Sequence, residues 1–89
     1  MIHGSDILTA KPGKRGELLK LFKGVIPTVL KEDGCLEYGP VVDVAGADPA
    51  FGPDTYVVVE KWRDMPALKA HAAASHMKEF GAKAADLIA

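Results

Sequence analysis

The chain has 89 residues, a length that allows one domain, residues 1–89, and leaves no room for a second core. Eleven Lys and Arg residues against twelve Asp and Glu residues give a net charge of -1, which argues against a basic surface for nucleic acid or for a membrane. The single cysteine excludes an internal disulfide framework and a cysteine-rich zinc site. No apolar run approaches the roughly 20 residues of a membrane span, and the N-terminal residues lack the pattern of a signal peptide. We therefore expect a cytoplasmic protein that binds neither nucleic acid nor a membrane.

The first part of the chain predicts a strand followed by a helix. Residues 2–10 weakly favour a strand, and the Pro and Gly residues that follow predict a turn. Residues 14–32 are typical of a helix, because apolar residues recur at intervals of three and four, namely Leu18, Phe22, Val25 and Val29. Pro27 predicts a kink, since it removes an amide from the helix, and Gly34 predicts the point where the helix has ended.

Two further strands are predicted in the middle of the chain. Residues 35–45 favour a strand interrupted at Gly39 and Pro40, so we expect either an edge position or a bulge there. A loop follows over residues 46–54. Residues 55–62 carry the clearest strand pattern, and alternation places one set of side chains on a common face, namely Tyr56, Val58, Glu60 and Trp62. Both faces are partly apolar, so we expect this strand to be central and covered on both sides.

The last part of the chain predicts helices. Residues 65–80 are rich in alanine and predict a helix that Asp64 caps, and Gly81 predicts a break before a short helix over residues 82–88. The order of elements indicates an α+β fold, a ferredoxin-like antiparallel sheet with two helices on one face. The final strand of that pattern is not evident. We therefore expect an open edge on the first strand, which a partner or a further length of chain would cover.

Several short segments together resemble a known family, the antibiotic biosynthesis monooxygenase (ABM) domain family. The resemblance spans roughly residues 7–80. The segments that carry it, in order, are PGK at 12–14, GCLEY at 34–38, EKWRD at 60–64, ALKAH at 67–71 and SHM at 75–77. Their order and spacing are fairly specific for the fold and much less specific for one reaction.

This resemblance implies a homodimer. In that family, the sheet of one ferredoxin-like protomer packs face to face against a second copy and forms a dimeric α/β barrel. Members include cofactor-independent monooxygenases that act on quinols and polyketide phenols, haem-degrading enzymes, and an isomerase of a phosphorylated sugar. The last strand, which this chain lacks, often contributes to the dimer interface.

His71 and His76 are the main candidates for catalysis, because imidazole titrates near neutral pH. Five positions along one helix rotate about 140°, so we expect that the two rings do not face one pocket squarely. They also lack the spacing of a helical metal pair, and we predict no metal site. The resemblance places the first histidine near the pocket, which favours His71. The alternative is that each ring only hydrogen-bonds to a strand or loop.

Five other residues are candidates for the site. Trp62 offers a flat apolar wall for an aromatic substrate, or it simply anchors its strand beneath a helix. Glu60, on the same face, is a candidate catalytic base, or it ties down a histidine or a backbone amide. Tyr38 and Tyr56 are candidates to donate a hydrogen bond to a substrate oxygen, or they belong to the core. His3 is a candidate to line the cavity, or it lies near a frayed terminus.

The motifs of dinucleotide, flavin, phosphate and serine-hydrolase sites are all missing from the sequence. The resemblance includes monooxygenases that need no such cofactor, and it therefore implies a cofactor-independent monooxygenase that oxidises a small aromatic or quinol-like substrate with O2. His71 would deprotonate the substrate, the anion would pass an electron to oxygen, and Trp62 would form the pocket wall. The alternatives are a haem-binding or haem-degrading enzyme, an isomerase of a small carbonyl compound, and a non-catalytic dimeric module that binds a ligand.

Overall fold

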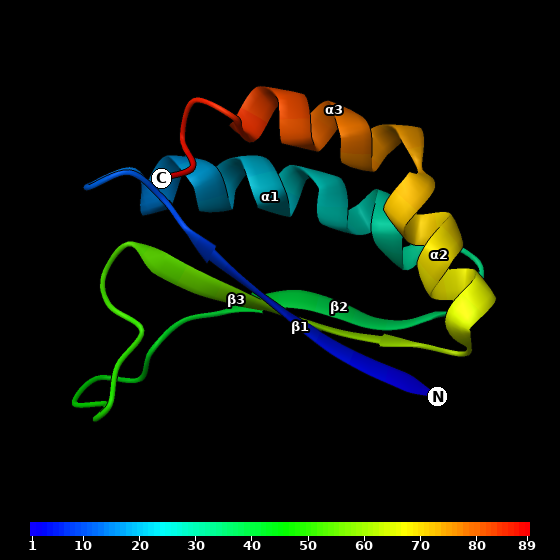
Figure 1. The fold of residues 1–89 in the computed structure, drawn as a ribbon, viewed down its shortest axis with the longest axis horizontal. Coiled ribbons are helices and arrows are strands. Elements are labelled where there is room, and N and C mark those ends of the chain that lie inside the picture. Colours follow the sequence, from blue (N-terminus) through cyan, green and yellow to red (C-terminus); the bar gives the residue numbers. More distant parts are fainter.

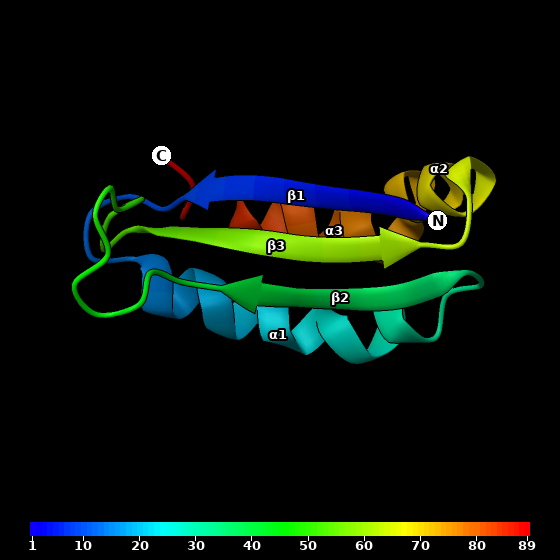
Figure 2. The same ribbon diagram turned by 90° about the horizontal axis from the view of Figure 1, so that it is seen from below.

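The computed structural model describes residues 1–89 and contains one sheet and three helices. The strands are antiparallel and lie in the order β1-β3-β2, with the helices on one face of the sheet (Figures 1 and 2). This arrangement confirms the α+β class and the antiparallel sheet. The elements in chain order are β1 Ile2–Thr9, α1 Arg15–Leu30, β2 Cys35–Val41, β3 Thr55–Trp62, α2 Met65–Ala73 and α3 Ser75–Ala84.

Strand β3 is central, as its alternating pattern predicted, and Figure 2 shows it between the other two strands. The side chains of its helix-facing set are all buried, namely Tyr56, Val58, Glu60 and Trp62. The expectation that β3 is covered on both sides is wrong for the single chain. Val57, Val59 and Lys61 on the other face are only half-buried, because all three helices pack on the first face.

Strand β2 lies at an edge of the sheet, which tolerates the missing amide of Pro40. The expected interruption at Gly39 and Pro40 is not there, since both residues keep their register with β3. The register shifts instead between Cys35 and Glu37. The strand also ends at Val41, four residues before the predicted end.

Helix α1 runs through Pro27 and ends at Leu30. The chain then turns at Gly34, whose φ of +81° is a conformation that residues with a Cβ atom rarely adopt. A Cβ atom at Gly34 would also lie 2.6 Å from the Cβ atom of Ala67 in α2. The predicted end of the helix is therefore confirmed, and glycine is required there by backbone conformation and by packing. Glu32 lies in this turn between α1 and β2.

The second helical region differs from the prediction. Asp64 caps α2 as expected, accepting a hydrogen bond of 3.0 Å from the Ala67 amide. The helix then breaks at Ala74, which is extended (ψ 143°), whereas Gly81 lies inside α3. No helix spans 82–88, because α3 ends at Ala84. The break turns α3 back along α1 (Figure 1). There Phe80 packs edge-on against Phe22. Tertiary packing thus overrides the helix propensity of the alanine-rich run.

The outer edge of β1 is covered only at its end. Ala10 forms an antiparallel bridge with Ile88, and the amide of Ala89 donates to the carbonyl of Thr9 over 2.9 Å. The rest of this outer edge of β1 has no strand beside it, as expected from the missing final strand. None of the helices combines the length and the apolar character that a membrane crossing requires.

The core lies between the sheet and helix α1. Phe22 on α1 is at its centre, with ring centroids 5.5 Å from Tyr38 and 5.4 Å from Tyr56. Fully burying a large apolar side chain stabilises a fold by about 1.5–3 kcal/mol, so this group supplies much of the stability of so short a chain. The largest fully buried side chains are Trp62, Tyr56, Phe22, Leu18, Val29 and Val58.

Candidate functional site

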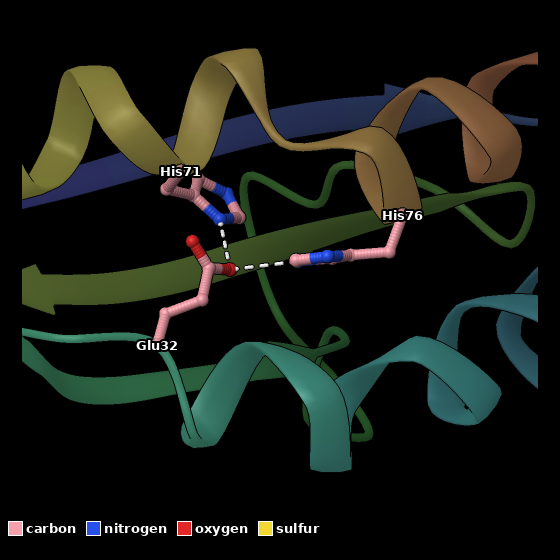
Figure 3. A group of neighbouring side chains, drawn as sticks. All are labelled: Glu32, His71 and His76. Carbon is pink, nitrogen blue, oxygen red and sulfur yellow. Dashed lines mark hydrogen bonds and ion pairs between the residues drawn. The ribbon is translucent and has the colours of Figure 1, made fainter.

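Two histidines meet at one carboxylate on the helix side of the sheet (Figure 3). The Oε2 atom of Glu32 lies 2.8 Å from Nδ1 of His71 and 2.9 Å from Nε2 of His76. Glu32 comes from the turn after α1, His71 from the end of α2, and His76 from the start of α3. The cluster therefore joins three segments that are far apart in the sequence or separated by a helix break.

The expectation that His71 and His76 do not face one pocket squarely agrees with the two different hollows that they line, but it did not foresee that both rings contact one oxygen of Glu32. It assumed one continuous helix, in which five positions rotate the second ring away from the first. The extended backbone at Ala74 interrupts the helix, so the helical rotation between the two positions does not apply. His76 lies in a new helix, and its ring contacts the same Glu32 oxygen as His71. Glu32 was missed altogether, because a single acidic residue in a charged turn carries no signal that it accepts hydrogen bonds from elsewhere.

The environment of His71 fixes the orientation of its ring. The side chain is buried, and its ring centroid lies 4.6 Å from that of Trp62 and 5.2 Å from that of Tyr38. A carboxylate only accepts hydrogen bonds, so the Nδ1 atom that contacts Glu32 carries the proton. The Nε2 atom of His71 then holds the lone pair and is the nitrogen that can take a proton from a substrate. By the same argument, His76 donates its Nε2 proton to Glu32.

Glu60 is a buried carboxyl group on β3 next to this cluster. It accepts a hydrogen bond of 2.7 Å from the indole nitrogen of Trp62. Burial raises the pKa of Glu60, and nearby Asp6 adds to the shift, while the Trp62 hydrogen bond opposes it. Gly4 pairs with Glu60 across the sheet, and a Cβ atom there would lie only 3.2 Å from Cγ of Glu60. The absence of a side chain at Gly4 therefore leaves room for the carboxyl group.

His71 and Glu60 line the same cleft. It has a volume of about 360 Å³ and lies between β1, β3 and helices α2 and α3. Trp62 does not line the cleft. Its indole nitrogen donates a hydrogen bond to Glu60, and its ring packs against the ring of His71. The residues that line the cleft are Gly4, Ser5, Asp6, Glu60, Leu68, His71, Ala72 and Met77.

A second hollow, of about 260 Å³, lies on the other side of the histidine cluster, between α1 and α3. His76 forms part of its wall, together with Thr28 and Phe80. Glu32 thus links a ring that reaches one hollow to a ring that reaches the other.

The remaining candidate residues lie at different places. Tyr38 is buried against His71, and burial raises its pKa well above the ordinary value. Tyr56 lies deeper in the core, its hydroxyl has no hydrogen-bond partner, and burial raises its pKa to about 12. Both phenols are therefore neutral near pH 7. His3 is exposed on the opposite face of the sheet, where it pairs with Lys61. The structure thus gathers His71, His76, Glu60, Trp62 and Tyr38, and it leaves Tyr56 and His3 apart from them.

Known proteins are similar to this chain in sequence and in fold. A family model described as antibiotic biosynthesis monooxygenase matches residues 7–83. A protein of Escherichia coli K12 named "Probable quinol monooxygenase YgiN" is 38% identical over 77 residues, which cover 82% of this chain and 74% of that protein. The crystal structure of a conserved protein from Methanosarcina mazei is 27% identical, with a TM-score of 0.82 over 97% of this chain and 79% of its own. PA3566 from Pseudomonas aeruginosa, at 24% identity, has the same fold, with a TM-score of 0.79 over 97% of this chain and 81% of its own. The chain therefore belongs to the antibiotic biosynthesis monooxygenase family.

Proposed function

We propose that the chain is a monooxygenase that oxidises a small quinol-like aromatic compound with O2 and without a redox cofactor. The observation that carries the proposal is the pairing of the buried His71 with Glu32 at the wall of a cleft. The name of the 38% identical relative supports the substrate class. The cleft volume of about 360 Å³ falls in the range of pockets that hold small organic ligands.

His71 acts as the base in this proposal. Its Nε2 atom takes the phenolic proton, and the ring becomes an imidazolium whose charge Glu32 stabilises over the 2.8 Å contact. The electron-rich anion then supplies the electrons that reduce O2. One oxygen atom enters the ring in place of a hydrogen atom and the other leaves as water, so that a phenol becomes a quinone and no external reductant is needed.

Glu60 and Trp62 shape the same reaction. The raised pKa of Glu60 favours a protonated carboxyl group, which can donate a hydrogen bond to a substrate oxygen. Trp62 holds Glu60 through its indole N–H and packs against the His71 ring. These contacts keep the acid and the base apart and oriented, which is the main contribution of a rigid active site.

We further propose that two copies of the chain pack together through the uncovered face of the sheet. Large apolar side chains are left on that side, with Ile7 61%, Leu36 56% and Val41 49% exposed. A monomer rarely leaves such a contiguous apolar surface in water. Val57 and Val59 of β3 lie between these strands, on the same face. A second copy would cover this surface and bury His3.

Oxygen uptake with a panel of hydroquinones and naphthols tests the proposed function. We expect His71→Ala to lower kcat by at least about 100-fold, the usual contribution of a general base. Glu32→Gln keeps the shape of the side chain but loses the charge that stabilises the imidazolium, so its kcat should also fall. Glu17→Gln, at an exposed position on α1, is the matched control.

Three outcomes are informative. Loss of uptake in His71→Ala, with normal uptake in Glu17→Gln, supports the proposal. Full activity of His71→Ala removes the base from the mechanism. Turnover of a carbonyl substrate without any oxygen consumption would contradict the monooxygenase and favour an isomerase that uses the same base.

A further inference from the structure

We propose that Glu32, His71 and His76 form a binding site for one divalent first-row transition-metal ion, such as Zn²⁺ or Co²⁺. Each residue offers one ligand atom, and the three atoms all lie within 4.8 Å of one another (Figure 3). The site belongs to the single chain, since all three ligands come from it.

The spacing of the ligand atoms on either side of Glu32 fits a metal ion. Metal–nitrogen and metal–oxygen bonds are about 2.1 Å long, so two ligands at right angles around one ion are about 3 Å apart. The two nitrogen–oxygen distances at Glu32 are 2.8 Å and 2.9 Å. Two imidazoles and one carboxylate on one side of an ion also leave positions open for water or another ligand.

The chemistry of the ligands selects the class of metal. Imidazole nitrogen suits zinc, iron, cobalt, nickel and copper, whereas magnesium and calcium prefer sites made of oxygen atoms. The three side chains are held by the fold, since those of His71, Glu32 and His76 are 8%, 15% and 25% exposed. Buried, preoriented ligands lose little conformational entropy when an ion binds.

An ion can reach the cluster from either side. His71 lines the cleft of about 360 Å³, and His76 lines the hollow of about 260 Å³ between α1 and α3. The ion would replace the two hydrogen bonds that Glu32 now accepts, and each ring proton would move to the other ring nitrogen, from Nδ1 to Nε2 in His71 and from Nε2 to Nδ1 in His76.

Metal binding has a consequence that rests on the proposed function. An ion on Nδ1 of His71 leaves the ring proton on Nε2, the nitrogen that would have to accept the substrate proton. A loaded site should therefore inhibit oxygen uptake, and removal of the ion with a chelator should restore it.

Cobalt titration of the full chain, produced without a histidine tag and freed of metal with a chelator, tests the site directly. We expect visible absorption of bound Co²⁺ that saturates at one ion per chain and disappears when Zn²⁺ is added. Trp62 is the only tryptophan, and its ring lies 4.6 Å from that of His71. Its fluorescence should therefore be quenched at the same stoichiometry.

Two variants should weaken the binding, and two should not. Glu32→Gln and His76→Ala each remove a ligand and should raise the Kd for Co²⁺ by more than about 100-fold, since even residues behind the ligands cost 10- to 100-fold. His3→Ala and Glu17→Gln change the same residue types away from the cluster and should bind normally. Circular dichroism checks that each variant is folded, and if His76→Ala is not, the isosteric Glu32→Gln decides.

The absence of saturable binding would overturn the metal site, as would binding that Glu32→Gln and His76→Ala leave unchanged. Neither result would contradict the proposed function, because oxygen uptake is measured in the absence of metal. Conversely, stoichiometric binding that leaves oxygen uptake unaffected would support the site and contradict His71 as the base.

Discussion

The two faces of the sheet share the same three strands but carry different side chains. On the helix-covered face, the buried Trp62, Glu60 and Tyr38 surround His71. On the other face, Ile7 and Val41 are about half exposed or more, and Lys61 forms an exposed ion pair with Glu37. One face therefore combines the core with the candidate site, while the other is an exposed surface with apolar side chains, the ring of His3 and one ion pair. Neighbouring residues of β3 point to opposite faces and allow this division of roles to be tested pair by pair.

The largest contrast is expected at Trp62 and Lys61. Trp62→Ala removes a fully buried side chain and should lower the free energy of unfolding by about 3–5 kcal/mol. Lys61→Ala breaks an exposed ion pair with Glu37 and should cost no more than about 1 kcal/mol. Urea unfolding of both variants measures the difference. Equal losses would show that the two faces do not differ in the way the burial of these residues indicates.

A smaller contrast, with identical chemistry, is expected at two adjacent valines. Val58 is 2% exposed under the helices, whereas Val59 is half-buried on the uncovered face. Val58→Ala should cost about 2 kcal/mol, from lost burial and from the cavity left behind. Val59→Ala should cost less than about 1 kcal/mol in a dilute monomer.

The same valine pair also tests the proposed dimer. If a second copy covers the open face, the cost of Val59→Ala should grow with protein concentration, because the substitution then weakens association as well. Sedimentation of the wild-type chain over the same concentrations provides the control. A monomer at every concentration would contradict the proposed packing of two sheets.

The division of the β3 side chains between the two faces was predictable from the sequence, but the exposure of one face was not, since both faces were expected to be covered. Alternation along residues 55–62 placed Glu60 and Trp62 on the buried face, and the apolar stripe of α1 supplied the cover. Local patterns report such features well, because burial repeats with the period of a strand or helix.

The histidine cluster was not predictable in the same way. The alanine-rich run favoured one long helix, and the break at Ala74 follows from the packing of α3 on α1 rather than from a local signal. Glu32 joins His71 from 39 positions away, and nothing in its neighbours distinguishes it from an ordinary surface carboxylate. Contacts between distant segments depend on tertiary structure, and the spacing of residues in the sequence does not report them.

The smallest expected effect is a change in the pH dependence of stability at Glu60. Burial raises the pKa of this carboxyl group in the folded chain. The folded state thus binds more protons than the unfolded state between the ordinary and the raised pKa, and Glu60 loses its stabilising contribution as pH rises through that window. Glu60→Gln cannot titrate and still accepts from Trp62.

Urea unfolding across the acidic and neutral range measures this effect. Relative to the wild-type chain, Glu60→Gln should become more stable as the pH rises, and the gain should level off above the raised pKa. The exposed Glu17→Gln provides the matched control, with a difference that stays flat. A gain that instead grows as the pH falls would mean that the pKa of Glu60 is lowered.

The central claim is that Glu32 holds His71 as a base, and the state of the His71 ring tests it most directly. Nitrogen NMR of the metal-free chain, labelled with ¹⁵N histidine, reports which ring nitrogen carries the proton. We predict a proton on Nδ1 of His71 and a lone pair on Nε2, with a changed pattern in Glu32→Gln. A proton on Nε2 and a bare Nδ1 in the wild-type chain would contradict the account, because the ring could then take no proton from a substrate in the cleft.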